Sequence, residues 1–155
     1  TVSKAQTTYH GILWEGLPVS WLENAPGQDF ASIFSLRPNL YQDFRAFQDL
    51  FAERELLPAT ILSSTRQRIA QLHNCSAELT RVQAPERDEP PLNCINACLE
   101  IAELFAQDPH AVPASGVAQV KAELGDAAVV ALMEWLAICD GFCRFQVILE
   151  VEHDQ

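Results

Sequence analysis

One segment near the C-terminal end constrains the fold more than any other. Residues 126–149 are apolar nearly all round a helix, with bulky side chains on most faces. A helix of this kind is buried on most of its faces, either at the centre of a domain or at a contact between subunits. Its tail, residues 145–151, also alternates like a strand, but no other segment offers a partner strand. The segment therefore predicts an all-α fold.

Helical spacing of apolar residues continues through the upstream sequence. Residues 40–51 place theirs on one face, and Pro38 suits the first turn of that helix because its missing N–H would have no partner there. Pro58 plays the same part for a second helix, which we expect to stop at His73-Asn74, since asparagine tolerates the left-handed conformation that ends helices. The other expected helices are residues 75–82, 95–106 and 114–124.

The length of 155 residues is that of one domain. Residues 1–28 are punctuated by glycine and proline but carry Trp14 and Trp21, so we expect an arm that packs on the core or on a neighbouring subunit. Residues 29–152 form the expected helical domain, in which Trp135 is a core or oligomer contact. Residues 83–91, with three prolines, are predicted to be an exposed loop.

Charge and cysteine content limit the partners and the compartment. The net charge of −11 opposes binding to nucleic acid or to an anionic membrane surface. The longest apolar stretch, residues 127–138, is interrupted by Glu134 and is too short to cross a bilayer. Five cysteines cannot all pair within the chain, and no signal-like segment opens the sequence. We therefore expect reduced thiols and a cytoplasmic protein.

A resemblance to a known family rests on residues 57–75, Leu-Pro-Ala-Thr-Ile-Leu-Ser-Ser-Thr-Arg-Gln-Arg-Ile-Ala-Gln-Leu-His-Asn-Cys. This run resembles the motif-bearing helix of the carboxymuconolactone decarboxylase and alkylhydroperoxidase-D-like family, where a similar phrase leads into a Cys-x-x-Cys-x-x-x-His active site. Residues 34–38 and 124–137 resemble that family's lead-in and closing helix. The resemblance implies a single-domain bundle of about six helices that assembles as a homo-oligomer, commonly a trimer or hexamer.

The motif itself is largely replaced. Cys75 matches the first cysteine, but Glu78 stands at the second cysteine and Val82 at the histidine. Ser63, twelve residues before Cys75, stands where family peroxidases carry a proton-relaying glutamate. A dithiol cycle needs a resolving thiol within disulfide reach, which position 78 does not supply. The sequence therefore predicts at most a single-thiol centre at Cys75.

Three residues are the candidates for catalysis: Cys75, His73 and Glu78. Cys75 is expected at a helix N-terminus, where unpaired N–H groups stabilise a thiolate. His73, two residues earlier, is a candidate base or cation. Glu78, one turn later, disfavours the thiolate by its charge, or forms an acid/base pair with it, or caps the helix. The alternative to a reactive Cys75 is a half-buried cap residue in a site that has lost its chemistry.

The other cysteines fall into two pairs with i,i+4 spacing, Cys94/Cys98 and Cys139/Cys143. Such pairs have Cβ atoms about 5–6 Å apart on a helix, farther than the roughly 3.5–4.5 Å of a disulfide. Four thiols could hold zinc if their helices faced each other, but free cysteine more commonly behaves as a small buried hydrophobe. No glycine-rich phosphate loop is present. We therefore expect neither a metal nor a cofactor.

Three hypotheses about function remain open. The first is an antioxidant oxidoreductase, a peroxidase that reduces a hydroperoxide at Cys75. The second is a non-redox, decarboxylase-like enzyme that holds a carboxylic acid with Arg66, Arg68 or Arg144, although Arg66 and Arg68 cannot share a helix face. The third is a catalytically inactive oligomeric scaffold or ligand-binding module. Asp140 and Arg144 are expected to form an ordinary i,i+4 salt bridge.

Overall fold

The structure is a computed structural model, and it describes residue 22 and residues 24–53, 57–79 and 90–151. This part of the chain is all-helical and contains no strand. Its elements are α1 (Phe30–Phe34), α2 (Pro38–Glu53), α3 (Ala59–His73), α4 (Ser76–Leu79), α5 (Leu92–Gln107), the 3-10 helix η1 (Pro109–Ala111), α6 (Ala114–Leu124) and α7 (Asp126–Ile148). The expected all-α fold is confirmed, with the short α1 as the helix that sequence periodicity missed.

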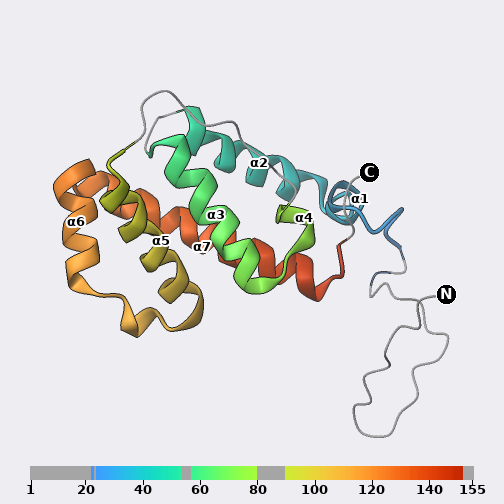
Figure 1. Ribbon diagram of the computed structural model, residues 1–155. Coiled ribbons are helices and arrows are strands. Elements are labelled where there is room, and N and C mark those ends of the chain that lie inside the picture. The colour runs from blue at the N-terminus through green and yellow to red at the C-terminus, as the bar shows by residue number, and fades with distance from the viewer. Residues whose placement is uncertain (1–21, 23, 54–56, 80–89, 152–155) are drawn as a thin grey trace, which may run out of the picture.

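Helix α3 lies across the middle of the molecule and packs against α5 and α7, while α6 packs against α5 and α7 at one end (Figure 1). The apolar stripes of these helices meet in the main core. Its fully buried large side chains are Ile61, Ile69, Ile101, Val120, Leu132 and Leu136. The indole Nε1 of buried Trp135 donates to the Leu62 carbonyl oxygen at 3.1 Å, which fixes α7 against α3.

A second, aromatic core joins α1 and α2 to the C-terminal half of α7. Phe44 and Phe142 stack with ring centroids 3.7 Å apart and an interplanar angle of 10°. Phe34 packs against both rings as well as against Phe145. Stacked and tilted rings of this kind bury large apolar areas. Rings from helices far apart in the sequence thus hold the N-terminal helices on α7.

The long helix α7 begins at Asp126 as expected and ends at Ile148, one residue before the expected end. The helix is less buried than its apolar residues on all faces predict. One face lies in the two cores, but Val130, Val147 and Ile148 are exposed, with 58%, 47% and 67% of their surface accessible. Within this chain, α7 is therefore buried on one side, and a subunit contact on the other side stays a prediction.

Helix ends follow local rules that the sequence displays. Pro38 is the first residue of α2, as expected, and Asn74 ends α3 with a left-handed φ of 52°. Gly125 separates α6 from α7 at a φ of 86°, which favours glycine. In the described residues, no helix is long and apolar enough to cross a membrane. The expected arm, apart from a few residues at its end, and nearly all of the 83–91 loop lie outside the described residues.

Candidate functional site

Cys75 is placed by the end of α3. Asn74 takes the left-handed conformation, and the Cys75 N–H then reaches back to the Ala70 carbonyl oxygen at 2.9 Å. This is the hydrogen bond of a Schellman motif, which closes a helix and turns the chain sharply. The carbonyl oxygen of Cys75 accepts the N–H groups of Glu78 and Leu79, each at 3.2 Å, and α4 begins directly after it. The expected position of Cys75 before a helix N-terminus is confirmed.

The side chain of Cys75 has a partner that sequence analysis missed, the thiol of Cys143 on α7. The two residues are almost completely buried, with 2% and 1% of their surface accessible. The i,i+4 spacing groups Cys143 with Cys139 along α7, but its hydrogen-bonding partner comes from the other side of the bundle. The sequence signal for this pair is weak: it amounts to Cys143 lying on the buried face of α7.

The two thiols differ in acidity. The hydrogen bond from Cys143, with smaller contributions from the backbone N–H groups of Glu78 and Ala77, lowers the pKa of Cys75 from the ordinary 9.0 to about 7. Burial and the negative charge of Glu78 act in the opposite direction. The pKa of Cys143 is raised, first by its hydrogen bond to Cys75 and then by burial. Cys75 is therefore the more acidic thiol of the pair.

Glu78 lies beside the pair in a closed polar cluster. Its carboxylate is bound through Oε2 by Nε and Nη2 of Arg66, both at 2.5 Å, and through Oε1 by the side-chain amide of Gln146 at 3.0 Å. Only 5% of the Glu78 side chain is accessible. We name Arg66, Glu78 and Gln146 the buried carboxylate cluster. The expected repulsion between Glu78 and the thiolate is present, and Arg66, considered earlier for holding a substrate acid, is occupied by Glu78.

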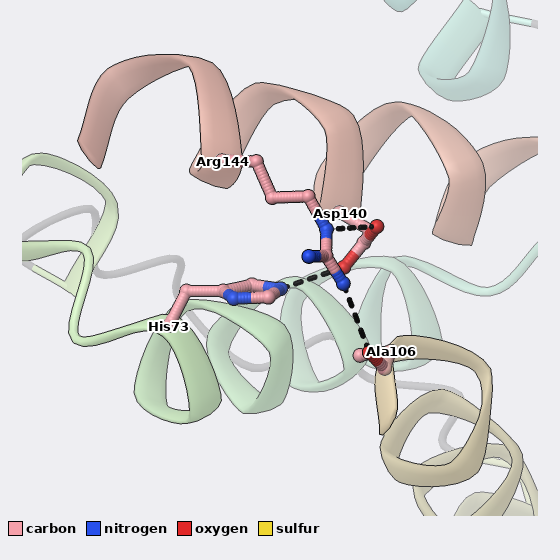
Figure 2. Close-up of polar contacts among 4 residues, drawn as sticks. All are labelled: His73, Ala106, Asp140 and Arg144. Carbon is pink, nitrogen blue, oxygen red and sulfur yellow. Dashed lines mark hydrogen bonds and ion pairs between the residues drawn. The ribbon is translucent and has the colours of Figure 1, made fainter. Parts of the chain in front are cut away.

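His73 takes part in a different cluster, between α3 and α7 (Figure 2). Its Nε2 lies 2.6 Å from Oδ1 of Asp140, and Nε of Arg144 donates to the other carboxylate oxygen at 2.8 Å. Arg144 Nη2 also donates to the carbonyl oxygen of Ala106 on α5 at 2.9 Å. The expected Asp140–Arg144 salt bridge is thereby confirmed. We name His73, Asp140 and Arg144 the outer cluster; the role of His73 as a base for Cys75 stays a prediction.

The other residues considered from the sequence are Ser63, Val82 and the remaining cysteines, and none of those described forms a second candidate site. The Ser63 hydroxyl donates to the Thr60 carbonyl within α3, at 3.2 Å, and Val82 lies outside the described residues. Burial raises the pKa of Cys98 and of Cys139 to about 12, and the pKa of Cys94 is also raised. All five cysteines are free. Within the described ranges, no three His, Cys, Asp or Glu side chains are grouped so that they could hold a metal ion.

A cavity of about 250 Å³ opens beside Cys75, between the ends of α3 and α7. Its described lining residues are Asn74, Cys75, Ser76, Ala77, Gln146, Val147, Glu150 and Val151. Cys75 is thus a lining residue although only 2% of its surface is accessible. Gln146, which holds Glu78, also lines it, so the buried carboxylate cluster adjoins the same space.

Comparison of this chain with protein-family models, with curated proteins and with solved structures gives no match. The candidate site is therefore assigned from its own geometry.

Proposed function

We propose that this chain is a thiol-dependent oxidoreductase that reduces a hydroperoxide, with Cys75 as the nucleophile and Cys143 as the resolving thiol. The observation that carries the proposal is the buried pair of Cys75 and Cys143, of which Cys75 lines a cavity; the lowered pKa of Cys75 supports it. The thiolate is the reactive form of cysteine, and a pKa near 7 supplies much of it at neutral pH. The resemblance to the alkylhydroperoxidase-D-like family supports the same reaction.

The proposed cycle has two steps. The Cys75 thiolate attacks the terminal oxygen of the hydroperoxide, the O–O bond breaks, and the alkoxide leaves as an alcohol after taking one proton from solvent. Cys75 is then a sulfenic acid. The Cys143 sulfur attacks the Cys75 sulfur, so that a Cys75–Cys143 disulfide forms and the hydroxyl leaves as water with the Cys143 proton. An external dithiol reduces the disulfide and completes the turnover.

This assignment differs from the family motif in the origin of the second thiol. In Cys-x-x-Cys both sulfurs come from one short segment, whereas here the second thiol is Cys143, from α7, and position 78 carries a carboxylate. Glu78 is held by Arg66 and Gln146, and we propose that it positions the pair and limits its acidity. The decarboxylase hypothesis is less well supported, because no described residue that lines the cavity is cationic.

Two expectations from the sequence accompany the proposal. Five free thiols suit a reducing compartment, so we propose a cytoplasmic location. From the family resemblance we propose a homo-oligomer, a trimer or hexamer, which sedimentation analysis of the purified protein tests directly.

The test of the function is a dose of cumene hydroperoxide to the reduced protein, followed by mass spectrometry. We expect rapid formation of a Cys75–Cys143 disulfide, and consumption of peroxide in the presence of a dithiol. Cys143→Ser should trap the sulfenic acid at Cys75, detected with dimedone, and Cys75→Ser should abolish peroxide consumption. Cys139→Ala is the matched control, because Cys139 is buried on the same helix and belongs to no thiol pair in the proposed cycle.

Slow oxidation spread over all five cysteines would contradict the proposal and favour the inactive scaffold. A disulfide between Cys75 and any cysteine other than Cys143 would contradict the assignment of the resolving thiol.

A further inference from the structure

The cavity beside Cys75 lies between two helix ends of the same kind. At the end of α3 the left-handed residue is Asn74, and at the end of α7 it is Glu150, with φ of 52° and 51°. The Val151 N–H bonds to the Gln146 carbonyl oxygen at 2.9 Å, which repeats the pattern of Cys75 with Ala70. Among the described residues, these two are the non-glycine residues with positive φ, and both line the cavity.

Glutamate is a poor choice for the conformation that Glu150 adopts. Left-handed positions at helix ends favour glycine and, after it, asparagine, because a side chain crowds the following carbonyl group. Burial of Val151, with 7% of its surface accessible, holds the chain in this turn. Residues kept in unfavourable backbone conformations cluster at functional sites. Here the unfavourable residue is an exposed glutamate that lines the cavity.

That carboxylate gives the cavity its charge. Among the described lining residues, Glu150 is the charged one, and the others are apolar, hydroxyl, thiol or amide side chains. The carboxylate of Glu78, which is not among the described lining residues, is paired with Arg66 and bound by the side-chain amide of Gln146. An anionic molecule that approaches the Cys75 thiolate therefore meets a carboxylate without a cation in the described wall to offset it.

We infer that Glu150 makes the cavity a charge filter, which admits small uncharged substrates to Cys75 and slows anionic ones. The inference rests on the proposed function, since it requires Cys75 to be the reacting thiolate. The volume of about 250 Å³ is below the roughly 300–1,000 Å³ of sites for drug-sized ligands. The substrate class is therefore a small neutral alkyl hydroperoxide, and hydroperoxides that carry a carboxylate are disfavoured.

The test compares two disulfide probes that differ in charge, dithiodipyridine, which is neutral, and dithionitrobenzoate, which is dianionic. The Cys75 thiolate attacks the S–S bond of either probe and releases one aromatic thiolate. Cys143 then displaces the second and leaves the Cys75–Cys143 disulfide, so two coloured equivalents are released per chain in the fast phase. Stopped-flow absorbance gives the two rate constants, and their neutral-to-anionic ratio is the measured quantity.

Glu150→Gln should lower this ratio by about 3- to 10-fold at low salt, because the repelled probe gains rate and the neutral one does not. High salt should shrink the difference between the wild type and the variant. Glu134→Gln is the matched control: it removes the same charge from an exposed position on α7, outside the described cavity lining. Glu150→Gly should lower the ratio equally while raising the melting temperature, because glycine suits the left-handed turn.

The outcomes separate the two proposals. No fast reaction of Cys75 with either probe overturns the proposed function. A fast reaction with both probes, with a ratio that Glu150→Gln or Glu150→Gly leaves unchanged, or that Glu134→Gln lowers equally, overturns the charge filter and leaves the proposed function standing.

Discussion

The two polar clusters of the molecule are built alike and differ in depth. Each holds one carboxylate where α3 meets α7, with an arginine on one of its oxygens: Arg66 on Glu78, and Arg144 on Asp140, whose other oxygen contacts His73. The accessible fraction is 5% for the Glu78 side chain and 17% for Asp140, and the Arg144 side chain is half exposed. The buried carboxylate cluster adjoins the thiol pair, whereas the outer cluster reaches to the carbonyl of Ala106 on α5.

The stability of the fold depends more on the buried carboxylate cluster than on the outer cluster. A buried carboxylate that loses its cation is left without water to replace it, whereas a carboxylate nearer the surface is solvated again. Because Glu78 is buried beside the thiol pair, its negative charge raises the pKa of Cys75. Perturbing the buried cluster should therefore change both stability and thiol acidity, and perturbing the outer cluster should change stability alone.

The largest expected effect is that of Arg66→Met. It leaves the Glu78 carboxylate buried with Gln146 as its remaining partner, so we expect a loss of about 2–4 kcal/mol in the free energy of unfolding. Urea denaturation measures this loss. The double variant Arg66→Met/Glu78→Leu removes the carboxylate together with its cation and should regain most of the lost free energy of unfolding. A loss under about 1 kcal/mol in the single variant would show that water still reaches the Glu78 carboxylate.

The next effect is on reaction rate. Because the pKa of Cys75 is lowered to about 7 and only the thiolate reacts, its alkylation by iodoacetamide should rise about tenfold between pH 6 and pH 8. Cys98 and Cys139, whose pKa values are raised to about 12, should stay nearly unreactive over that range. Glu78→Gln removes a charge that raises the Cys75 pKa, so the midpoint should move to lower pH. Peptide mapping after timed alkylation gives the profile, and a midpoint near 9 would contradict the thiol pairing.

A smaller effect is expected for Asp140→Asn in the outer cluster. The amide keeps the shape but loses the charge-assisted bonds to His73 and Arg144, which should lower the free energy of unfolding by about 1 kcal/mol. The alkylation midpoint of Cys75 should not change. A shift of this midpoint as large as that expected for Glu78→Gln would show that the outer cluster also affects Cys75. It would support His73 as a partner of the thiolate.

The smallest effect is expected for Arg68→Ala. Arg68 pairs with Glu103 at 3.2 Å, and 40% of each side chain is accessible. Exposed pairs contribute between zero and about 1 kcal/mol, and we expect less than about 0.5 kcal/mol here. This variant is the matched control for Arg66→Met, since both remove an α3 arginine. Equal losses from the two variants, in the same denaturation experiment, would show that burial does not separate these ion pairs.

Local signals predicted the helices well. Pro38, Asn74 and Gly125 mark helix boundaries through backbone preferences that act within a few residues, and the structure places them as expected. The helix α1 was missed because five residues are too few for a period to be recognised. Its N-cap signal, Asp29 bonded to the Ser32 N–H at 2.9 Å, is present in the sequence but weak beside the surrounding loop-like composition.

Only part of the candidate site could be predicted from the sequence. Cys75 and Glu78 are three residues apart, so their proximity follows from local geometry. Cys143 and Gln146 reach the site from α7, and Arg66 reaches Glu78 from the preceding helix. Such contacts depend on how helices cross, which one chain's hydrophobic pattern does not encode. The i,i+4 spacing groups Cys139 with Cys143 on one face of α7 but carries no information about Cys75.

One turn of α7 belongs to both cores. Phe142 stacks on Phe44, and the next residue, Cys143, meets Cys75. The two residues are neighbours on one helical turn, so the ring stack also fixes the position of the Cys143 side chain. A displacement of either ring is therefore transmitted through one turn of backbone to the Cys143 side chain.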